Sequence, residues 1–454
     1  MYQVKNGEGP AGVKKQIDVN ELQIGMYVSE LDRPWLETPF LFQGIEIESQ
    51  AQIDELKRYC KYVFIDVNDS VGAAVVQRRA VEPGPVSGPV VVRPRSTFLN
   101  KAPENVFAKT DHKKIEFEIL KKTVAPQNKP HAYVDQTSLE EEIDNVRRSH
   151  TQAKEMISTI MEDVRLGRSI EVDGAKQVVA EMAASVIRNP DALVCFTQLK
   201  NKDYYTAEHS LRVSILSLTF GRQLGCERDA LELLGIGALM HDIGKLKIPN
   251  DILNKPGELT QQEALLMEQH VPYGVEILEQ TSIPNESIDV ARYHHERYDG
   301  TGYKFGLKGE AIGYFGAIGG IVDFYDAMTS DRSYRAAVPP HVILRDMYKM
   351  RNSLFHPHLV EQFIQCMGVY PIGSVVELNT GDVGVVINMN RRRRLKPRVT
   401  LVLKPDSRPY TGKKTIDLDT DRTANGGVYE IKTVIEPEKY HINPARYLPI
   451  ANIA

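Results

Sequence analysis

Apolar positions recur at helical spacing through the central half of the chain. Ser138 followed by Leu139-Glu140-Glu141-Glu142 is an N-terminal capping pattern, and apolar residues then return every three or four positions. The Ala-rich and Leu-rich segments 175–187 and 204–224 keep the same spacing. Because the pattern continues to about residue 368, we predict an all-α helical bundle over residues 138–370.

The flanking segments follow other patterns. Residues 14–66 mix short strand-like runs with one helical run at 52–62, and residues 67–110 are rich in Pro and Gly, which deny that stretch a helix. After residue 370, apolar positions alternate on both sides of the turn Asn379-Thr380-Gly381-Asp382, which is typical of a β-hairpin. The predicted fold is mainly α, in four parts: a small α+β domain at 1–66, a linker at 67–137, the helical domain at 138–370, and a small β-rich appendage at 371–454.

Composition limits the class of protein. At 454 residues the chain is long enough for two or three domains, and a formal net charge of −4 argues against bulk nucleic-acid binding. The run Arg391–Arg394 lies between two predicted strands, so we interpret it as a solvated hairpin tip rather than a polyanion site. Four scattered cysteines, the lack of an apolar signal region and the lack of a membrane-spanning stretch favour a cytoplasmic protein without membrane insertion.

The pair His241-Asp242 is the strongest indication of chemistry. It follows an apolar run, and adjacent helical positions diverge by about 100°, so both side chains reach one place only if the helix ends there or carries them to a common metal. Five of the 12 histidines fall between residues 209 and 295, each in or beside an apolar segment. Five imidazoles and two carboxylates suit Fe, Mn or Zn and exceed what one tetrahedral ion needs. The alternative is a set of core histidines whose ring nitrogens bond backbone carbonyls.

Residues 200–370, about a third of the chain, resemble an HD-GYP domain, the HD-superfamily subclass of bacterial cyclic-di-GMP phosphodiesterases. The segment from Gly25 to Trp35, with Pro39-Phe40, is similar to the N-terminal domain that often precedes such modules. The stretches that carry the main resemblance occur in the family's order: His209-Ser210-Leu211-Arg212-Val213, His241-Asp242-Ile243-Gly244-Lys245, His270-Val271-Pro272-Tyr273-Gly274, His294-His295-Glu296-Arg297-Tyr298-Asp299-Gly300-Thr301-Gly302-Tyr303, and the run from Asp323 to Arg335.

The resemblance implies a two-metal site. One ion would be held by His209, His241, Asp242 and Asp323, and the other by His270, His294 and His295, with Asp242 as the bridge between them. Lys245 matches a lysine near the scissile phosphate, and Tyr303, Arg332 and Arg335 are assigned to the substrate. The cofactors expected are two divalent ions, Fe or Mn first, with Zn and others as alternatives.

Two positions depart from the family pattern. Members with a third metal carry a Glu four residues before the first His, where this chain has Tyr205, so we expect two ions. Lys304 follows Gly302-Tyr303 in place of the family's Pro, and because Pro fixes φ, its loss should loosen that loop.

The expected function is hydrolysis of cyclic-di-GMP to linear pGpG, and onward to GMP as a further step, by a metal-bridged hydroxide. One alternative is a cyclic-di-GMP-binding signalling protein with weak or no turnover, and another is an HD phosphohydrolase for a different cyclic dinucleotide. The partner expected is cyclic-di-GMP, without nucleic acid. Other signalling proteins are further expected partners, and they would bind through the Gly302-Tyr303-Lys304 loop or the N-terminal domain. The native metal, the final product and the oligomeric state, for which a dimer is one option, stay open.

Overall fold

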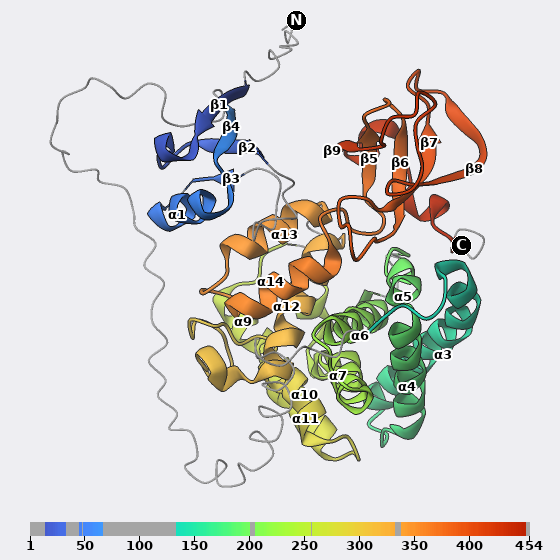
Figure 1. Cartoon of the computed structure of the whole chain (residues 1–454). Coiled ribbons are helices and arrows are strands. Elements are labelled where there is room, and N and C mark those ends of the chain that lie inside the picture. The colour runs from blue at the N-terminus through green and yellow to red at the C-terminus, as the bar shows by residue number, and fades with distance from the viewer. Residues whose placement is uncertain are drawn as a thin grey trace, which may run out of the picture. The chain divides into compact units, whose positions relative to one another are not determined.

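A computed structural model describes residues 14–32, 45–47, 49–66, 133–199, 205–255, 257–331 and 337–450. The chain divides into two compact units, residues 1–109 and residues 110–454, and each is described by itself. The larger unit contains the helical bundle and the C-terminal β-sheet, and Figure 1 labels the elements of both units.

The described residues of the N-terminal unit form a four-stranded antiparallel sheet with one α-helix. Its elements are β1 (Lys14–Asp18), the 3-10 helix η1 (Val19–Glu21), β2 (Tyr27–Leu31), β3 (Ile45–Glu46), α1 (Gln50–Tyr59) and β4 (Tyr62–Asp66). The strand order is β1-β4-β2-β3. Val28, Leu56 and Val63 are fully buried between the sheet and the helix. This arrangement confirms the predicted small α+β fold, and Trp35 lies outside the described residues.

The helical bundle follows the predicted pattern closely. Its α-helices are α3 (Leu139–Arg165), α4 (Asp173–Arg188), α5 (Pro190–Phe196), α6 (Tyr205–Gln223), α7 (Arg228–Met240), α8 (Asn250–Leu253), α9 (Gln261–Met267), α10 (His270–Glu279), α11 (Asn285–Tyr293), α12 (Tyr314–Thr329), α13 (Pro340–Lys349) and α14 (Pro357–Met367). The connections between them include the 3-10 helices η3 (Ile243–Lys247) and η4 (Gly309–Ile312). The capping box is present at the start of α3, where the Ser138 amide donates to the Glu141 carboxylate at 2.8 Å. Within the described ranges, no helix has the length and apolar character to cross a bilayer.

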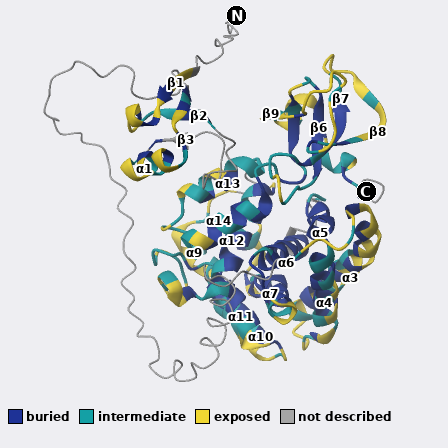
Figure 2. Cartoon of the chain, in the orientation of Figure 1, coloured by how far each residue is buried: buried dark blue, intermediate teal, exposed yellow. Residues whose placement is uncertain are grey.

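Helices α6 and α7 lie at the centre of the bundle. Figure 2 shows both as largely buried, and α6 packs against α7 on one side and α12 on another. The side chains of Leu218 and Phe220 on α6, and of Leu231 and Leu234 on α7, are fully buried. A helix that is apolar almost all round must be covered on every face, and this is why α6 and α7 occupy the core.

The C-terminal sheet has five antiparallel strands in the order β8-β7-β6-β5-β9. The strands are β5 (Val375–Leu378), β6 (Val383–Asn388), β7 (Arg398–Leu403), β8 (Pro409–Asp417) and β9 (Ile431–Val434), followed by the 3-10 helices η5 (Pro437–Tyr440) and η6 (Pro444–Tyr447). The predicted hairpin is confirmed: β5 pairs with β6 across a turn in which Gly381 has φ +83°. The core of this sheet includes Val376, Val386 and Val399.

The interpretation of the arginine run as a solvated tip is wrong for Arg391. The run does lie in the β6–β7 loop, and Arg392 and Arg393 are exposed there. The guanidinium of Arg391, however, forms ion pairs with Asp191 at the start of α5 and with Asp135, the latter at 3.2 Å. Asp191 also accepts hydrogen bonds from the Asn388 side chain and the Met389 amide. Arg391 therefore links the β-sheet to the helical bundle, through partners that local sequence does not disclose.

Candidate metal centre

Five elements deliver the predicted ligands to one buried place. His209 lies on α6, His241 and Asp242 lie at the end of α7, and Asp323 lies on α12. His270 is the first residue of α10, and the pair His294-His295 directly follows α11. Their ligand atoms form two groups in which all atoms lie within 4.8 Å of one another: His209, His241 and Asp323 in one, and Asp242, His270, His294 and His295 in the other.

The end of α7 lets two adjacent residues face one centre. Met240 is the last residue of the helix, His241 keeps right-handed helical dihedrals as the C-cap, and Asp242 has left them, with φ −103° and ψ 10°. The next turn, η3, packs backbone to backbone against α10. A Cβ on Gly244 would lie 2.0 Å from the His270 carbonyl oxygen, so only glycine allows this approach. The close packing brings Asp242 and His270 together.

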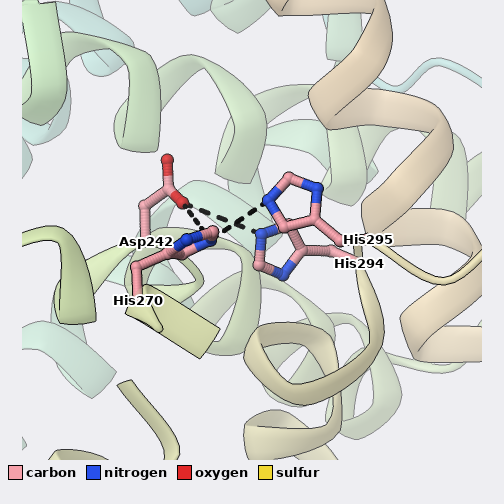
Figure 3. A group of neighbouring side chains, drawn as sticks. All are labelled: Asp242, His270, His294 and His295. Carbon is pink, nitrogen blue, oxygen red and sulfur yellow. Dashed lines mark hydrogen bonds and ion pairs between the residues drawn. The ribbon is translucent and has the colours of Figure 1, made fainter. Parts of the chain in front are cut away.

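The two carboxylate oxygens of Asp242 face different groups of imidazoles. Oδ1 lies 3.5 Å from His270 Nε2 and 3.7 Å from His294 Nε2. Oδ2 lies 3.5 Å from His209 Nε2 and 3.3 Å from His241 Nε2. Figure 3 shows the group that faces Oδ1, with the rings of His270, His294 and His295 on one side of the Asp242 carboxylate. One side chain thus joins both groups, which is the geometry of a bridging ligand.

Backbone carbonyls fix the orientation of three imidazoles. His241 Nδ1 donates to the Ala238 carbonyl at 2.7 Å, and His270 Nδ1 donates to the Met267 carbonyl at 2.6 Å. His294 Nδ1 donates in the same way to carbonyls one turn earlier. With the hydrogen on Nδ1, the lone pair of each neutral ring is on Nε2, which points into the centre. This is the arrangement that a metal requires of histidine.

Several atoms at the centre have no hydrogen-bond partner among the described residues: His241 Nε2, His294 Nε2 and Asp242 Oδ1. Each is buried, and a buried polar atom without a partner costs free energy. One cation in each group would satisfy all three. Imidazole nitrogens and carboxylate oxygens are also the donor set that first-row divalent metals prefer. The residues present therefore fit a metal. The alternative of ordinary core histidines does not explain why these buried atoms lack hydrogen-bond partners among the described residues.

The electrostatics of the two groups differ. Burial alone would lower the pKa of His241, but the carboxylates of Asp242 and Asp323 outweigh it and raise that pKa to about 9. The same competition raises the pKa of His209. In the second group burial prevails, since it lowers the pKa of His270 to about 3 and takes that of His295 well below its ordinary value. The field at the first group therefore attracts positive charge most strongly.

Two residues that the sequence argument did not select complete the surroundings of His209. Its Nδ1 lies 2.7 Å from Asp326 Oδ2, and Arg212 donates to both oxygens of that carboxylate, at 2.7 and 3.0 Å. The charged side chains of Asp326 and Arg212 can stay buried because each is paired with the other. The sequence did contain a signal for them: Arg212 follows His209, and Asp326 follows Asp323, by three residues, a spacing that places both members on one helix face.

The loop after the histidine pair packs against the centre. The ring of Tyr303 stacks on that of His295, with centroids 4.6 Å apart and planes 25° apart. The Glu296 carboxylate accepts hydrogen bonds from the amides of Phe305 and Leu307, which ties the loop beyond Lys304 to the bundle. Proline is absent at position 304, and Glu296 supplies these anchors in the same loop.

Of the remaining predicted site residues, Lys245 lies within the described structure and the arginines do not. Lys245 Nζ contacts Asp242 Oδ2, and its side chain is one fifth exposed, so it lies between the centre and solvent. Arg332 and Arg335, predicted to bind phosphate, lie outside the described residues. Tyr205 begins α6, but its side chain is also outside the described part of the structure, so the expected absence of a third metal stays a prediction.

Comparison with known families gives three matches along the chain. Residues 14–175 match a domain of unknown function (DUF3391), residues 194–359 match the HD domain, and residues 375–441 match a KOW domain associated with the HD domain. These matches cover the N-terminal unit, the helices that hold the two groups, and the C-terminal sheet. The first match extends beyond the N-terminal unit, through α3 and into the start of α4.

Three curated relatives are similar to this chain. A cyclic di-GMP phosphodiesterase of Pseudomonas aeruginosa is 33% identical over 415 residues, which is 90% of this chain and 91% of the relative. A cyclic di-GMP phosphodiesterase of Thermotoga maritima is 36% identical over 166 residues, 36% of this chain and 45% of that protein. A 3′3′-cGAMP-specific phosphodiesterase of Vibrio cholerae is 33% identical over 162 residues, 35% of this chain and 31% of that protein.

Proposed function

Because the chain belongs to the HD-GYP-type family of HD domains, with the N-terminal DUF3391 domain, we propose that it hydrolyses cyclic-di-GMP to linear pGpG. The chain is an HD phosphohydrolase, and its two His/Asp groups are consistent with a dinuclear metal site. The observation that carries the proposal is the geometry of Asp242, whose two oxygens face the two groups separately. Fe or Mn is the proposed metal, with Zn as the alternative.

The chain's own residues would divide the work as follows. His209, His241 and Asp323 would hold one ion, His270, His294 and His295 the other, and Asp242 both. Bound there, divalent ions would supply Lewis-acid chemistry, which acidifies water and offsets charge on the phosphoryl oxygens. Helix ends and backbone hydrogen bonds hold the imidazoles in advance of substrate binding, so little reorganisation is needed during the reaction.

Lys245 is the proposed partner of the scissile phosphate. Its ammonium group lies at Asp242 Oδ2 and is partly exposed, so it can meet a ligand that enters from solvent. There it would neutralise charge on the phosphoryl group or protonate the leaving 3′ oxygen. Arg332 and Arg335 stay the proposed phosphate-binding residues on the strength of the resemblance alone.

The test is chromatography of cyclic-di-GMP after incubation with the protein loaded with Mn²⁺ or Fe²⁺, beside the variants Asp242→Ala and Asp289→Asn. Asp289 is a matched control, since it is a buried aspartate whose carboxylate pairs with Arg292 on its own helix. Formation of pGpG or GMP by the parent and the control, but not by Asp242→Ala, is the expected result. Intact cyclic-di-GMP beside a metal-loaded parent would contradict the proposal.

A parallel incubation with 3′3′-cGAMP separates the alternatives, since one relative is named for that substrate. Hydrolysis of 3′3′-cGAMP alone would keep the chemistry and change the substrate. Binding of cyclic-di-GMP without turnover, measured by calorimetry on the metal-loaded protein, would instead favour a receptor.

A further inference from the structure

The pair Asp326–Arg212 has no role in the two-metal scheme above, although it lies directly behind one of the predicted ligands. We infer that Asp326, held by Arg212, positions His209 and makes the two metal positions unequal, so that the His209/His241/Asp323 position binds its ion more tightly and fills first. This inference rests on the metal centre of the proposed function. It concerns the order and strength of metal binding, not the substrate.

The ring of His209 lies between two carboxylates from one helix, and the Nδ1 end donates to one of them. Asp323 and Asp326 are three residues apart on α12, so both face α6. Asp326 Oδ2 lies 2.7 Å from His209 Nδ1, and Asp323 Oδ1 lies 3.1 Å from His209 Nε2. The hydrogen on Nδ1 is thereby directed to Asp326, and the Nε2 lone pair is directed toward Asp323 and the centre. One turn of helix thus supplies both a predicted ligand and the residue that aims its neighbour.

Arg212 keeps Asp326 in place and ionised. It lies three residues after His209 on α6, so the same helix face carries the imidazole and the guanidinium. Its Nε and Nη2 donate to the two oxygens of Asp326, and Nη2 also lies 3.4 Å from Ser330 Oγ. Such a bidentate pair fixes the plane of the carboxylate, and the plane decides where His209 points. Both side chains are buried, at 6% and 3% exposure, so water does not compete for these bonds.

The second group is built differently. His270 and His294 give their Nδ1 hydrogens to neutral backbone carbonyls, and Asp242 is the sole carboxylate among the four members of that group. The first group has Asp323 of its own, faces Oδ2 of Asp242, and has a histidine backed by a carboxylate. A carboxylate acceptor makes an imidazole a stronger donor to metal, and losing it costs about 10–100-fold in metal affinity. Greater negative charge and a more basic imidazole both favour the first position.

The test is calorimetric titration of the metal-free full-length protein with Mn²⁺, with bound metal counted by elemental analysis. The parent should bind Mn²⁺ in two distinguishable steps. Asp326→Asn should weaken the tighter step about 10–100-fold and leave the weaker step unchanged. The amide keeps the shape of the carboxylate, but its NH₂ group must face a donor of Arg212 in either orientation. Asp289→Asn, which alters a buried Asp–Arg pair within α11 and leaves the His209 surroundings intact, should keep both steps.

Further variants guard against a merely structural effect. Asp326→Glu keeps the charge and should retain two steps, and Arg212→Lys should weaken the tighter step because it loses the fork. A cooperative thermal unfolding transition of each metal-free variant establishes that the variant is folded. If Asp326→Asn is unfolded, the metal titration of Arg212→Lys takes its place as the test. The visible spectrum of Co²⁺ at one equivalent should differ between the parent and Asp326→Asn, since the first ion changes position.

Two equal steps in the parent, or unchanged steps in a folded Asp326→Asn, would overturn the inference. None of these measurements uses a cyclic dinucleotide. Unequal steps without hydrolysis would therefore overturn the proposed function alone, and hydrolysis with equal steps would overturn this inference alone.

Discussion

The Nε2 atoms of His270 and His295 lie 3.1 Å apart, and the hydrogen of the His270 ring is on the other nitrogen, where it bonds the Met267 carbonyl. Burial keeps both rings neutral, since it lowers both pKa values. Either His295 donates a hydrogen to His270, or both lone pairs meet one cation. The second arrangement satisfies His294 and Asp242 as well, and it makes His295 a ligand of the second position.

Replacement of His295 by Gln should therefore remove one ion and spare the other. We expect bound metal to fall from about two ions per chain to about one, measured by elemental analysis after gel filtration. His358→Gln, at an exposed position on α14, is the control and should keep both ions. Loss of both ions from His295→Gln would show that the two positions do not fill independently.

Tyr303 offers a test between two roles. If its ring supports His295 by stacking, Tyr303→Phe should behave as the parent, and Tyr303→Ala should weaken metal binding by about 1 kcal/mol, or roughly fivefold. If its hydroxyl contacts the substrate, as the family resemblance implies, Tyr303→Phe should raise KM with metal content unchanged. Metal titration and steady-state kinetics on both variants decide between the two.

Arg391→Ala should destabilise the protein by about 3 kcal/mol, because it leaves the buried Asp191 carboxylate without its cation. Urea unfolding followed by circular dichroism measures the change. The adjacent Arg392 is exposed, so Arg392→Ala should change the free energy of unfolding by less than about 0.5 kcal/mol. Equal effects of the two substitutions would mean that Arg391 contributes only surface charge.

Glu142 should make stability depend on pH. Burial of this carboxyl would raise its pKa, but hydrogen bonds from Arg188 and Ser185 prevail and lower it. A carboxyl whose pKa is lowered in the folded state stabilises the protein above its unfolded pKa, about 4.3, and the contribution disappears as pH falls through the folded pKa. Glu142→Gln should thus be less stable than the parent at pH 7, and the difference should shrink below about pH 4. Urea unfolding at several pH values tests this, and a constant difference would contradict it.

Metal should stabilise the folded protein. Since the ligands are assembled from five separate elements, the unfolded chain lacks the site. Mn²⁺ at about 100 times its Kd should add about 2.7 kcal/mol to the free energy of unfolding. Calorimetry with Mn²⁺ and with a chelator measures the difference, which should be much smaller for Asp242→Ala. An equal gain in that variant would place the stabilising ion elsewhere.

Much of the fold follows from local sequence. Three kinds of local signal each depend on a few neighbouring residues: the Ser138 capping box, the periodic apolar residues of α4 and α6, and the turn at Gly381. The elements they specify can therefore be predicted without knowledge of tertiary contacts. The predicted ligands were also found together, because imidazoles and carboxylates set in apolar segments are costly unless they share a partner.

Long-range pairings were not predictable in the same way. Arg391 and Asp191 are 200 residues apart, and the local sequence around each residue does not identify the other as its partner. Asp326 is a different case: its spacing from Asp323 was visible, but a carboxylate on the same helix face as a ligand has many uses. Only the position of the His209 ring between the two shows which use applies.

The contact between the β6–β7 loop and Asp191 bears on how the protein can be divided. Sequence families treat the HD domain and the KOW domain as separate modules, at residues 194–359 and 375–441. The Asp191 carboxylate at the start of α5, just before the first matched residue of the HD domain, nevertheless accepts hydrogen bonds from Asn388 and Met389 and pairs with Arg391, all within the KOW match. A chain cut between the two would leave a buried anion with none of these donors. We therefore expect the helical bundle to be less stable when the C-terminal sheet is removed.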